Sequence, residues 1–262
     1  MLWPRTICRW AAVPRILAMM TRPRSVPLQS QRAASGDAGD PAAAAAAASP
    51  SAHAEPHDYS LPNSSWTERT MALYRAYLAR TPEGGGSGWT RLPSYNRTIL
   101  HEAEYRARPR KPRPERLLTR NTEVVGAGFE YAAFHSGAER RTVCIFQPGP
   151  LLEGFPGFVH GGALAALIDG IAGTCARNVA GMIMTANLNI DYRSPVPLGS
   201  TVLLDACVTE VDGKKVYTTC RVLAHDESAV HTDCTALFIV VDEVKIRHLK
   251  EIFLRNEERQ KA

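Results

Sequence analysis

Residues 158–177 read FVHGGALAALIDGIAGTCAR, and two glycines after a histidine open a helix-length run that is apolar on nearly every side. A helix of this kind is normally buried. Its many alanines keep it narrow, so that a sheet can wrap closely around it. The stretch therefore predicts a central helix enclosed by the rest of its domain.

Asp169 conflicts with that burial, because it is the only acidic residue between Glu153 and Asp191 and lies in the middle of the helix. An unpaired carboxylate in an apolar interior is costly. One interpretation is that neighbouring backbone donors satisfy it; the other is that it performs chemistry. The glycines at the helix start, Gly161 and Gly162, would let a ligand approach unpaired N–H groups that can hold an oxyanion.

Strands are indicated on both sides of this helix. Two precede it and four follow it, each rich in Val, Ile, Leu, Thr or Tyr and bounded by turn residues. Asp212-Gly213 is a hairpin signal. The pattern predicts an α+β domain with a long antiparallel β-sheet wrapped around the central helix. The predicted strands are residues 128–134, 141–147, 182–192, 201–211, 215–224 and 230–241.

The first 36 residues carry six arginines and no acid, interleaved with apolar residues, the composition of a mitochondrial presequence. A retained, disordered N-terminus is the alternative. Cleavage after Arg32 or Ala33 would change the formal net charge from +5 to −1, so the mature chain would not be notably basic. Residues 37–62, with seven successive alanines between prolines, predict a disordered linker.

Residues 63–122 predict a helical and basic extension. Ser65 and Glu68 form a capping box for a helix over residues 65–80. Residues 106–120 hold seven Arg or Lys, one Glu and three prolines, and are interpreted as a solvated connector rather than a contact for nucleic acid or anionic lipid. Residues 123–242 form the predicted main domain, and residues 243–262 a charged C-terminal tail.

Several classes of site are excluded by missing motifs. The six cysteines include no C-x-x-C pair, so neither a zinc site nor a disulfide framework is indicated. There is no G-x-S-x-G elbow and no phosphate loop. No apolar run approaches the length of a membrane span. Cys175 lacks a neighbouring base that would make it a nucleophile.

The H-G-G run with Asp169 nine residues after His160 resembles the hotdog-fold acyl-CoA thioesterases of the phenylacetic-acid-thioesterase type. The segments SWTERT, WTRLPSY, GFEY, VCIFQPGP, LEGFPGFVHGG and MTANLNIDYRSPVP are similar to members four and five of the thioesterase superfamily, over residues 63–241. The resemblance implies a hotdog fold, a homodimer or dimer of dimers with active sites between subunits, and hydrolysis of medium- to long-chain fatty acyl-CoA without a metal or organic cofactor. It also implies a mitochondrial location, in the matrix or at the inner membrane by peripheral contact, with a cytoplasmic pool as an alternative.

The same resemblance assigns catalytic roles. Asp169 would be the general base or the nucleophile, a choice that the residues leave open. The Gly161 N–H would form the oxyanion hole, and Thr185 would reach into the partner's site to orient water, unless it is an ordinary strand residue. His160 is a helix-starting residue in hotdog relatives, with proton transfer as the alternative. Gly154 stands where several relatives carry Asn or Gln.

Substrate-binding residues are implied in two groups. Asp191, Arg193 and Ser194 would follow the nucleotide of coenzyme A together with Lys214 and Lys215, while Gly162 allows close approach at the helix start. No nucleic-acid partner is expected. The alternative function, also implied by the resemblance, is a regulatory protein that binds a protein kinase of the Akt type and uses the hotdog domain as a scaffold.

Overall fold

The computed structural model describes residues 58–94, 118–120 and 122–242. The chain divides by its internal contacts into two units, Met1–Glu55 and Pro56–Ala262, and every described residue belongs to the second. The predicted presequence, nearly all of the linker, residues 106–117 of the basic segment and the C-terminal tail lie outside the described residues.

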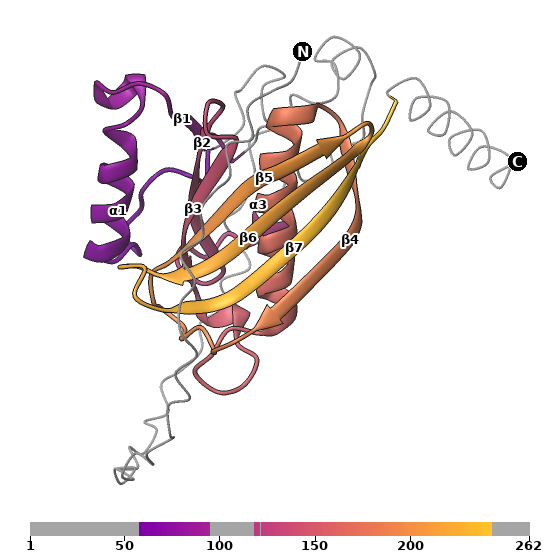
Figure 1. Ribbon diagram of the computed structural model, residues 1–262. Helices are drawn as coiled ribbons and strands as arrows, with labels where there is room; N and C mark the ends of the chain where they lie inside the picture. The colour runs from indigo at the N-terminus through magenta and orange to yellow at the C-terminus, as the bar shows by residue number, and fades with distance from the viewer. Residues whose placement is uncertain (1–57, 95–117, 121, 243–262) are drawn as a thin grey trace, which may run out of the picture. The chain divides into compact units, whose positions relative to one another are not determined.

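A seven-stranded antiparallel sheet wraps around one long helix, α3 (Gly161–Ala180), as Figure 1 shows. The strand order is β1-β2-β3-β5-β6-β7-β4. This arrangement confirms the predicted α+β hotdog fold. The strands are β1 (Thr90–Leu92), β2 (Phe129–Ser136), β3 (Arg141–Pro148), β4 (Ile183–Tyr192), β5 (Val202–Asp212), β6 (Lys215–Ala224) and β7 (Val230–Val240).

The turns explain the register of this sheet. β2 and β3 pair along their full lengths across a short connection, and β5 and β6 meet at Asp212 and Lys215. Gly213 in that hairpin has φ +54°, a left-handed conformation that glycine adopts without strain. Both predicted hairpins are confirmed. Strand β1 lies in the WTRLPSY segment, which is not among the six predicted strands.

Helix α3 packs one side against the sheet. The largest core cluster includes its apolar residues Leu164, Leu167, Ile168 and Ile171, together with inward-facing side chains from all the strands that it crosses. The opposite side of α3 is open, and the exposed positions on it include Gly161, Gly162, Gly170 and Asn178. The prediction of a helix buried all round is therefore wrong on that side, because one sheet covers only one side of the helix.

A second core lies on the outer face of the sheet. Helix α1 (Glu68–Leu78) covers β2 and β3 there, and its Tyr77 stacks on Phe134 with ring centroids 5.6 Å apart. Three short 3-10 helices, η1 (Pro82–Gly84), η2 (Leu118–Arg120) and η3 (Pro150–Leu152), lie in the connections. The extension thus belongs to the same hydrophobic structure as the sheet.

The predicted capping box of α1 is wrong. The helix begins at Glu68, three residues later than expected, and its N-cap is Thr67, whose hydroxyl accepts a hydrogen bond from the Thr70 N–H at 3.2 Å. The Ser65 hydroxyl instead donates to Asn63 Oδ1 at 2.6 Å. The Asx turn formed by Asn63 competes for Ser65, so the cap passes to the next hydroxyl residue along the chain.

Strand β4 forms one edge of the sheet, and most of its side chains are exposed. Met184 and Tyr192 are its large exposed hydrophobic residues, at 59% and 52%. An edge strand offers unpaired backbone groups, and natural proteins usually cover or pair such edges.

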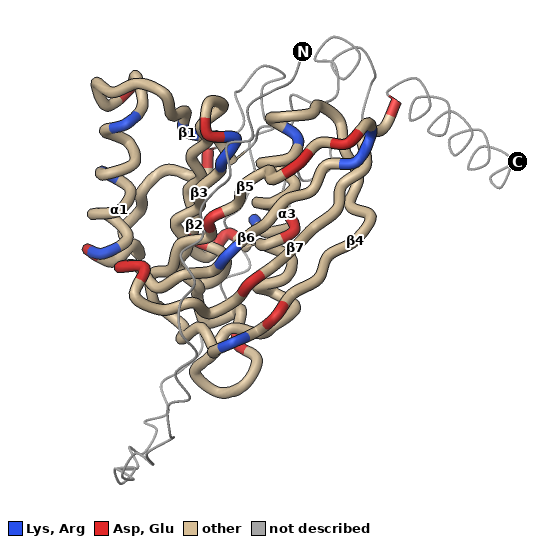
Figure 2. Tube along the Cα trace, in the orientation of Figure 1, with Lys and Arg blue, Asp and Glu red and all other residues tan. Residues whose placement is uncertain are grey.

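Charged residues of both signs are interspersed over the described part of the chain rather than gathered in one patch (Figure 2). Among the described residues, no helix is both long and apolar enough to cross a membrane. Five cysteines lie buried with free thiols, and burial raises the pKa of the Cys175 and Cys234 thiols to about 11.

Candidate functional site

Asp169 and Thr185 meet on the open side of α3. The Thr185 hydroxyl, on β4, donates a hydrogen bond to Asp169 Oδ1 at 2.9 Å. The carboxylate is half-buried and Thr185 is exposed. Asp169 is therefore not enclosed in the apolar interior. Its side chain lies at the border between helix, edge strand and solvent, where a charged carboxylate loses little hydration.

The bond to Thr185 fixes one carboxylate oxygen and leaves the other open. No described side chain or backbone group contributes a hydrogen bond to Asp169 Oδ2. This oxygen can attack a carbonyl or take a proton from water. The Thr185 hydroxyl is bonded to the Asp169 of the same chain. That Thr185 also serves a partner's site stays a prediction.

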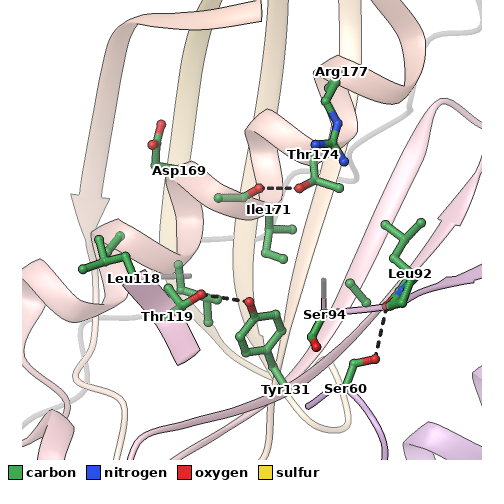
Figure 3. A pocket seen from close by; sticks show the side chains of 15 residues that line it. Ser60, Leu92, Ser94, Leu118, Thr119, Tyr131, Asp169, Ile171, Thr174 and Arg177 are labelled. Carbon is green, nitrogen blue, oxygen red and sulfur yellow. Dashed lines mark hydrogen bonds between the residues drawn. The ribbon is translucent and has the colours of Figure 1, made fainter. Parts of the chain in front are cut away.

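A cavity of about 340 Å³ adjoins Asp169, a volume within the usual range for small-molecule sites. Two of the described lining residues are charged, Asp169 and Arg177, and they lie on different sides in Figure 3 with Thr174 beside Arg177. Its remaining lining residues are Ser60, Leu92, Pro93, Ser94, Leu118, Thr119, Tyr131, Ala133, Ala166, Leu167, Gly170, Ile171 and Thr174.

The N-terminal extension supplies five of these lining residues, and the end of the predicted linker supplies a sixth, Ser60; sequence reasoning missed this contribution. Ser60, Leu92 and Ser94 belong to the segments around β1, and Leu118 and Thr119 to η2. The sequence alone assigned no site role to the WTRLPSY segment. Its similarity to related thioesterases was the one signal that could have indicated a part in the site.

The start of α3 is organised by His160. This residue is the N-cap, and its Nδ1 accepts a hydrogen bond from the Gly162 N–H at 2.9 Å. The Gly162 N–H is therefore occupied, whereas the Gly161 N–H belongs to the first turn and has no intrahelical acceptor. This geometry suits the oxyanion role expected of Gly161 and a capping role for His160.

Tyr192 is a further residue at the helix start that sequence reasoning did not single out. Its hydroxyl donates to the Gly161 carbonyl at 2.8 Å, which ties the end of β4 to the first turn of α3. A tyrosine within MTANLNIDY was part of a predicted strand, but nothing in the strand pattern indicated where its hydroxyl would lie.

Gly154 cannot carry the amide side chain found in several relatives. A Cβ atom built on Gly154 would lie 2.7 Å from His160 Cα, which is closer than real Cβ contacts allow. The backbone before α3 folds back so tightly that the His160 N–H donates to the Leu152 carbonyl at 2.7 Å. Any carbonyl-positioning role of a side chain at this position is absent from this chain.

The two groups of expected nucleotide-binding residues lie at opposite ends of β4. Arg193 forms an ion pair with Asp233, the Ser194 hydroxyl lies 3.1 Å from His231 Nδ1, and Asp191 is in register with Asp233, all near the start of α3. Ten residues of strand span about 30 Å. At the other end, Lys215 pairs with Ile239 and the Lys214 carbonyl accepts from the Val240 N–H at 2.7 Å.

Among the described residues no group of three or more His, Cys, Asp or Glu side chains could hold a metal ion.

Comparisons with known proteins agree with this geometry. A family model described as "Thioesterase superfamily" matches residues 156–231, which include the helix start, Asp169 and Thr185. Acyl-coenzyme A thioesterase THEM4 of Xenopus laevis is 48% identical over 185 residues, covering 70% of this chain and 81% of the relative. Acyl-coenzyme A thioesterase THEM5 of Homo sapiens is 34% identical, covering 70% and 74%.

A solved structure, smu.793 from Streptococcus mutans UA159 bound to acetyl CoA, is 19% identical with a TM-score of 0.39, covering 46% of this chain and 94% of that chain. The sequence relatives are more similar, and each covers 70% of this chain. The chain therefore belongs to the thioesterase superfamily, together with the THEM4 and THEM5 proteins.

Proposed function

We propose that this protein hydrolyses medium- to long-chain acyl-coenzyme A thioesters to free acid and coenzyme A. The observation that carries the proposal is the Thr185 to Asp169 hydrogen bond at the mouth of the cavity, which leaves one carboxylate oxygen available. The names of the relatives, acyl-coenzyme A thioesterases THEM4 and THEM5, support the same substrate class.

Two routes fit this site. In the first, Asp169 Oδ2 removes a proton from water, the hydroxide adds to the thioester carbonyl, and the tetrahedral intermediate expels coenzyme A thiolate, which regains the proton. In the second, Oδ2 attacks the carbonyl itself and expels coenzyme A thiolate. Water then cleaves the resulting anhydride, which releases the acid, regenerates the Asp169 carboxylate and supplies the proton that the thiolate takes up. In both, the Gly161 N–H stabilises the oxyanion. A thioester is reactive enough for these groups to act without a metal or organic cofactor.

The proposed site needs two subunits. Gly161 and Asp169 lie eight residues apart on one helix, about 12 Å along its axis, so they cannot act on the same carbonyl within one chain. Two copies with their open α3 sides facing each other and their α3 helices antiparallel would bring the Gly161 of one copy to the Asp169 of the other. The exposed edge of β4 supports such pairing, and we propose a homodimer on this basis.

The test measures release of free coenzyme A from acyl-coenzyme A substrates of graded chain length by the full chain. Asp169→Asn should lower kcat by about a thousandfold, because the amide can neither accept the proton nor attack. Thr185→Ala should lower kcat by about ten- to a hundredfold, since the carboxylate loses its orientation, and Thr185→Ser should restore most of it. Equal activity of Asp169→Asn and the unmodified protein would overturn the proposal.

The nucleotide path is tested separately. We propose that coenzyme A runs past one or both ends of β4, with Asp191, Arg193 and Ser194 at one end and Lys214 and Lys215 at the other, because cations pair readily with its phosphates. Lys214→Ala with Lys215→Ala should raise KM with little change in kcat. An unchanged KM removes the two lysines from the path.

Location and regulation are proposals from the sequence. Residues 1–36, which lie outside the described part of the chain, support mitochondrial import, and an N-terminal sequence of the mature protein that begins at Met1 would contradict it. No observation within the described residues favours the kinase-binding alternative.

A further inference from the structure

Among the described residues that line the cavity beside Asp169, Arg177 is the cation, and it lies two turns further along α3. Figure 3 shows the guanidinium beside Thr174 within the lining and away from the carboxylate. The separation of the two residues along the helix axis is about 12 Å. A ligand that reacts at Asp169 and extends along this cavity therefore brings its distant end toward a positive charge.

Arg177 has no anionic partner in the described part of the chain. It is half-buried, and burial alone lowers its pKa, with no acidic group offsetting the effect. Three other arginines on the described sheet and extension are paired with acids: Arg91 with Asp58, Arg141 with Asp205 and Arg193 with Asp233. The buried Arg120 is instead bonded to the Phe129 and Tyr131 carbonyls. A desolvated guanidinium without a partner is costly, and an anion that entered the cavity would remove this cost.

The hydroxyl groups around the cavity are already used. Ser60 donates to Asp58 Oδ1 at 2.6 Å, Thr174 donates to the Gly170 carbonyl at 2.7 Å, and Thr119 lies 2.8 Å from the Tyr131 hydroxyl. Between the two charged ends, the surface is formed largely by apolar groups, among them Leu92, Ala133, Leu167 and Ile171. Among the described lining residues, the cavity thus combines largely apolar groups with one cation that has no acidic partner.

We propose that Arg177 binds a carboxylate at the far end of the acyl chain, so that the protein prefers monothioesters of dicarboxylic acids over simple fatty acyl thioesters of matched length. This inference rests on the proposed thioesterase function. A guanidinium suits this ligand because it binds a carboxylate with two parallel hydrogen bonds. The apolar groups of the cavity would hold the methylene groups between the reacting carbonyl and the terminal carboxylate.

A position in the last turn of α3 also lets Arg177 interact favourably with the helix dipole. That role alone would make the residue matter for stability and not for the choice between substrates. Recognition of the coenzyme A phosphates would alter the binding of every substrate to the same degree. The ratio between two substrates that differ only at the chain end separates both of these roles from the proposed one.

The experiment compares dodecanoyl-CoA with dodecanedioyl-CoA, and octanoyl-CoA with octanedioyl-CoA, for the full chain and for Arg177→Met and Arg177→Lys. The unmodified protein should favour a dicarboxylic substrate by about ten- to a hundredfold in kcat/KM. Arg177→Met should abolish this preference and leave hydrolysis of the simple substrate intact, and Arg177→Lys should retain part of the preference. Melting temperatures of the three proteins report any general loss of folding.

Binding is measured in parallel with analogues in which a methylene group replaces the thioester sulfur, so that affinity can be read without turnover. If no thioester is hydrolysed but the dicarboxylic analogue binds more tightly in an Arg177-dependent manner, the proposed function fails and the chain-end site stands. If simple substrates are hydrolysed and neither assay shows an Arg177-dependent preference at either length, the chain-end proposal is overturned. An equal loss for all substrates in Arg177→Met overturns it as well.

Discussion

His160 illustrates how one side chain can be mistaken for a catalytic base. Its Nδ1 already accepts the Gly162 N–H, so the ring acts as an N-cap. We expect His160→Ala to destabilise the protein by about 1 kcal/mol and to lower kcat by disturbing the Gly161 N–H. His160→Asn, which can also cap a helix, should restore both stability and activity. An Asn variant that is folded but inactive would instead show that the imidazole transfers a proton.

Gly154 packs against the backbone of His160 at the start of α3. Because a Cβ there would meet His160 Cα at 2.7 Å, Gly154→Ala should displace the His160 backbone, lower the melting temperature and reduce hydrolysis. The matched control is Gly157→Ala, whose added Cβ meets no atom within 4 Å but whose φ of +83° is strained. It should lower stability without changing kcat. Equal losses of kcat in the two variants would contradict the close-contact explanation.

The extension around β1 is held by one carboxylate, that of Asp58. It accepts hydrogen bonds from Ser60, the Ser94 N–H and Arg91. Burial raises the pKa of Asp58, but these hydrogen bonds together outweigh burial and hold the pKa well below its usual range. Since the folded pKa lies below the unfolded one, the stabilisation is fully present above the unfolded pKa and is lost as the pH falls toward the folded pKa.

We therefore expect the extension to loosen on acidification below about pH 4. The cavity would then lose the contribution of Leu92 and Ser94, and hydrolysis should become less dependent on chain length. Asp58→Asn should be less stable than the unmodified protein at neutral pH and show a smaller further loss in acid. Thermal unfolding followed over a pH series measures the effect, and parallel pH curves for the two proteins would contradict it.

The elements of the sheet and the central helix were predictable from the sequence because their signals are local. Apolar periodicity, turn residues and Gly213 locate six strands and α3 to within a few residues. Asp169 and Gly161 were identified by their residue types against the apolar helix and by family resemblance. Thr185 was identified by resemblance alone, and in the structure its hydroxyl donates a hydrogen bond to Asp169 of the same chain.

The remaining features depend on contacts between distant segments. Tyr192 reaches Gly161 across 31 residues of sequence, and the cavity lining joins segments that are up to 117 positions apart, from Ser60 to Arg177. The cap of α1 was misassigned because Asn63 competes for Ser65. No periodicity records such pairings, so the roles of Tyr192, Arg177 and the β1 segment became visible only in the folded chain.

The assembled molecule should be a dimer in which β4 is no longer an edge. Met184 on β4 is 59% exposed, and its side chain points to the opposite face from Thr185 because successive residues of a strand alternate. Met184→Lys places a charge on this edge and should shift the protein toward monomer. If the active site needs two subunits, kcat should fall in parallel.

Light scattering after size-exclusion chromatography measures this shift, and the matched control Val211→Lys changes an exposed residue of β5 and should leave the mass unchanged. A monomeric unmodified protein with full hydrolysis would show that one chain suffices.

The five buried cysteines can be used to follow local unfolding of the protein by chemical labelling. A thiol reacts with alkylating agents only as an accessible thiolate. Four of the five, Cys144, Cys175, Cys220 and Cys234, belong to the core between the sheet and α3. Pulses of iodoacetamide would alkylate each cysteine when local unfolding exposes it, and mass spectrometry would identify the alkylated cysteines. Cys175 would report on the helix, and Cys220 and Cys234, opposite each other on β6 and β7, would report on the sheet. The buried cysteines thus serve as natural probes, and the order in which they are labelled would show the order in which parts of the protein unfold.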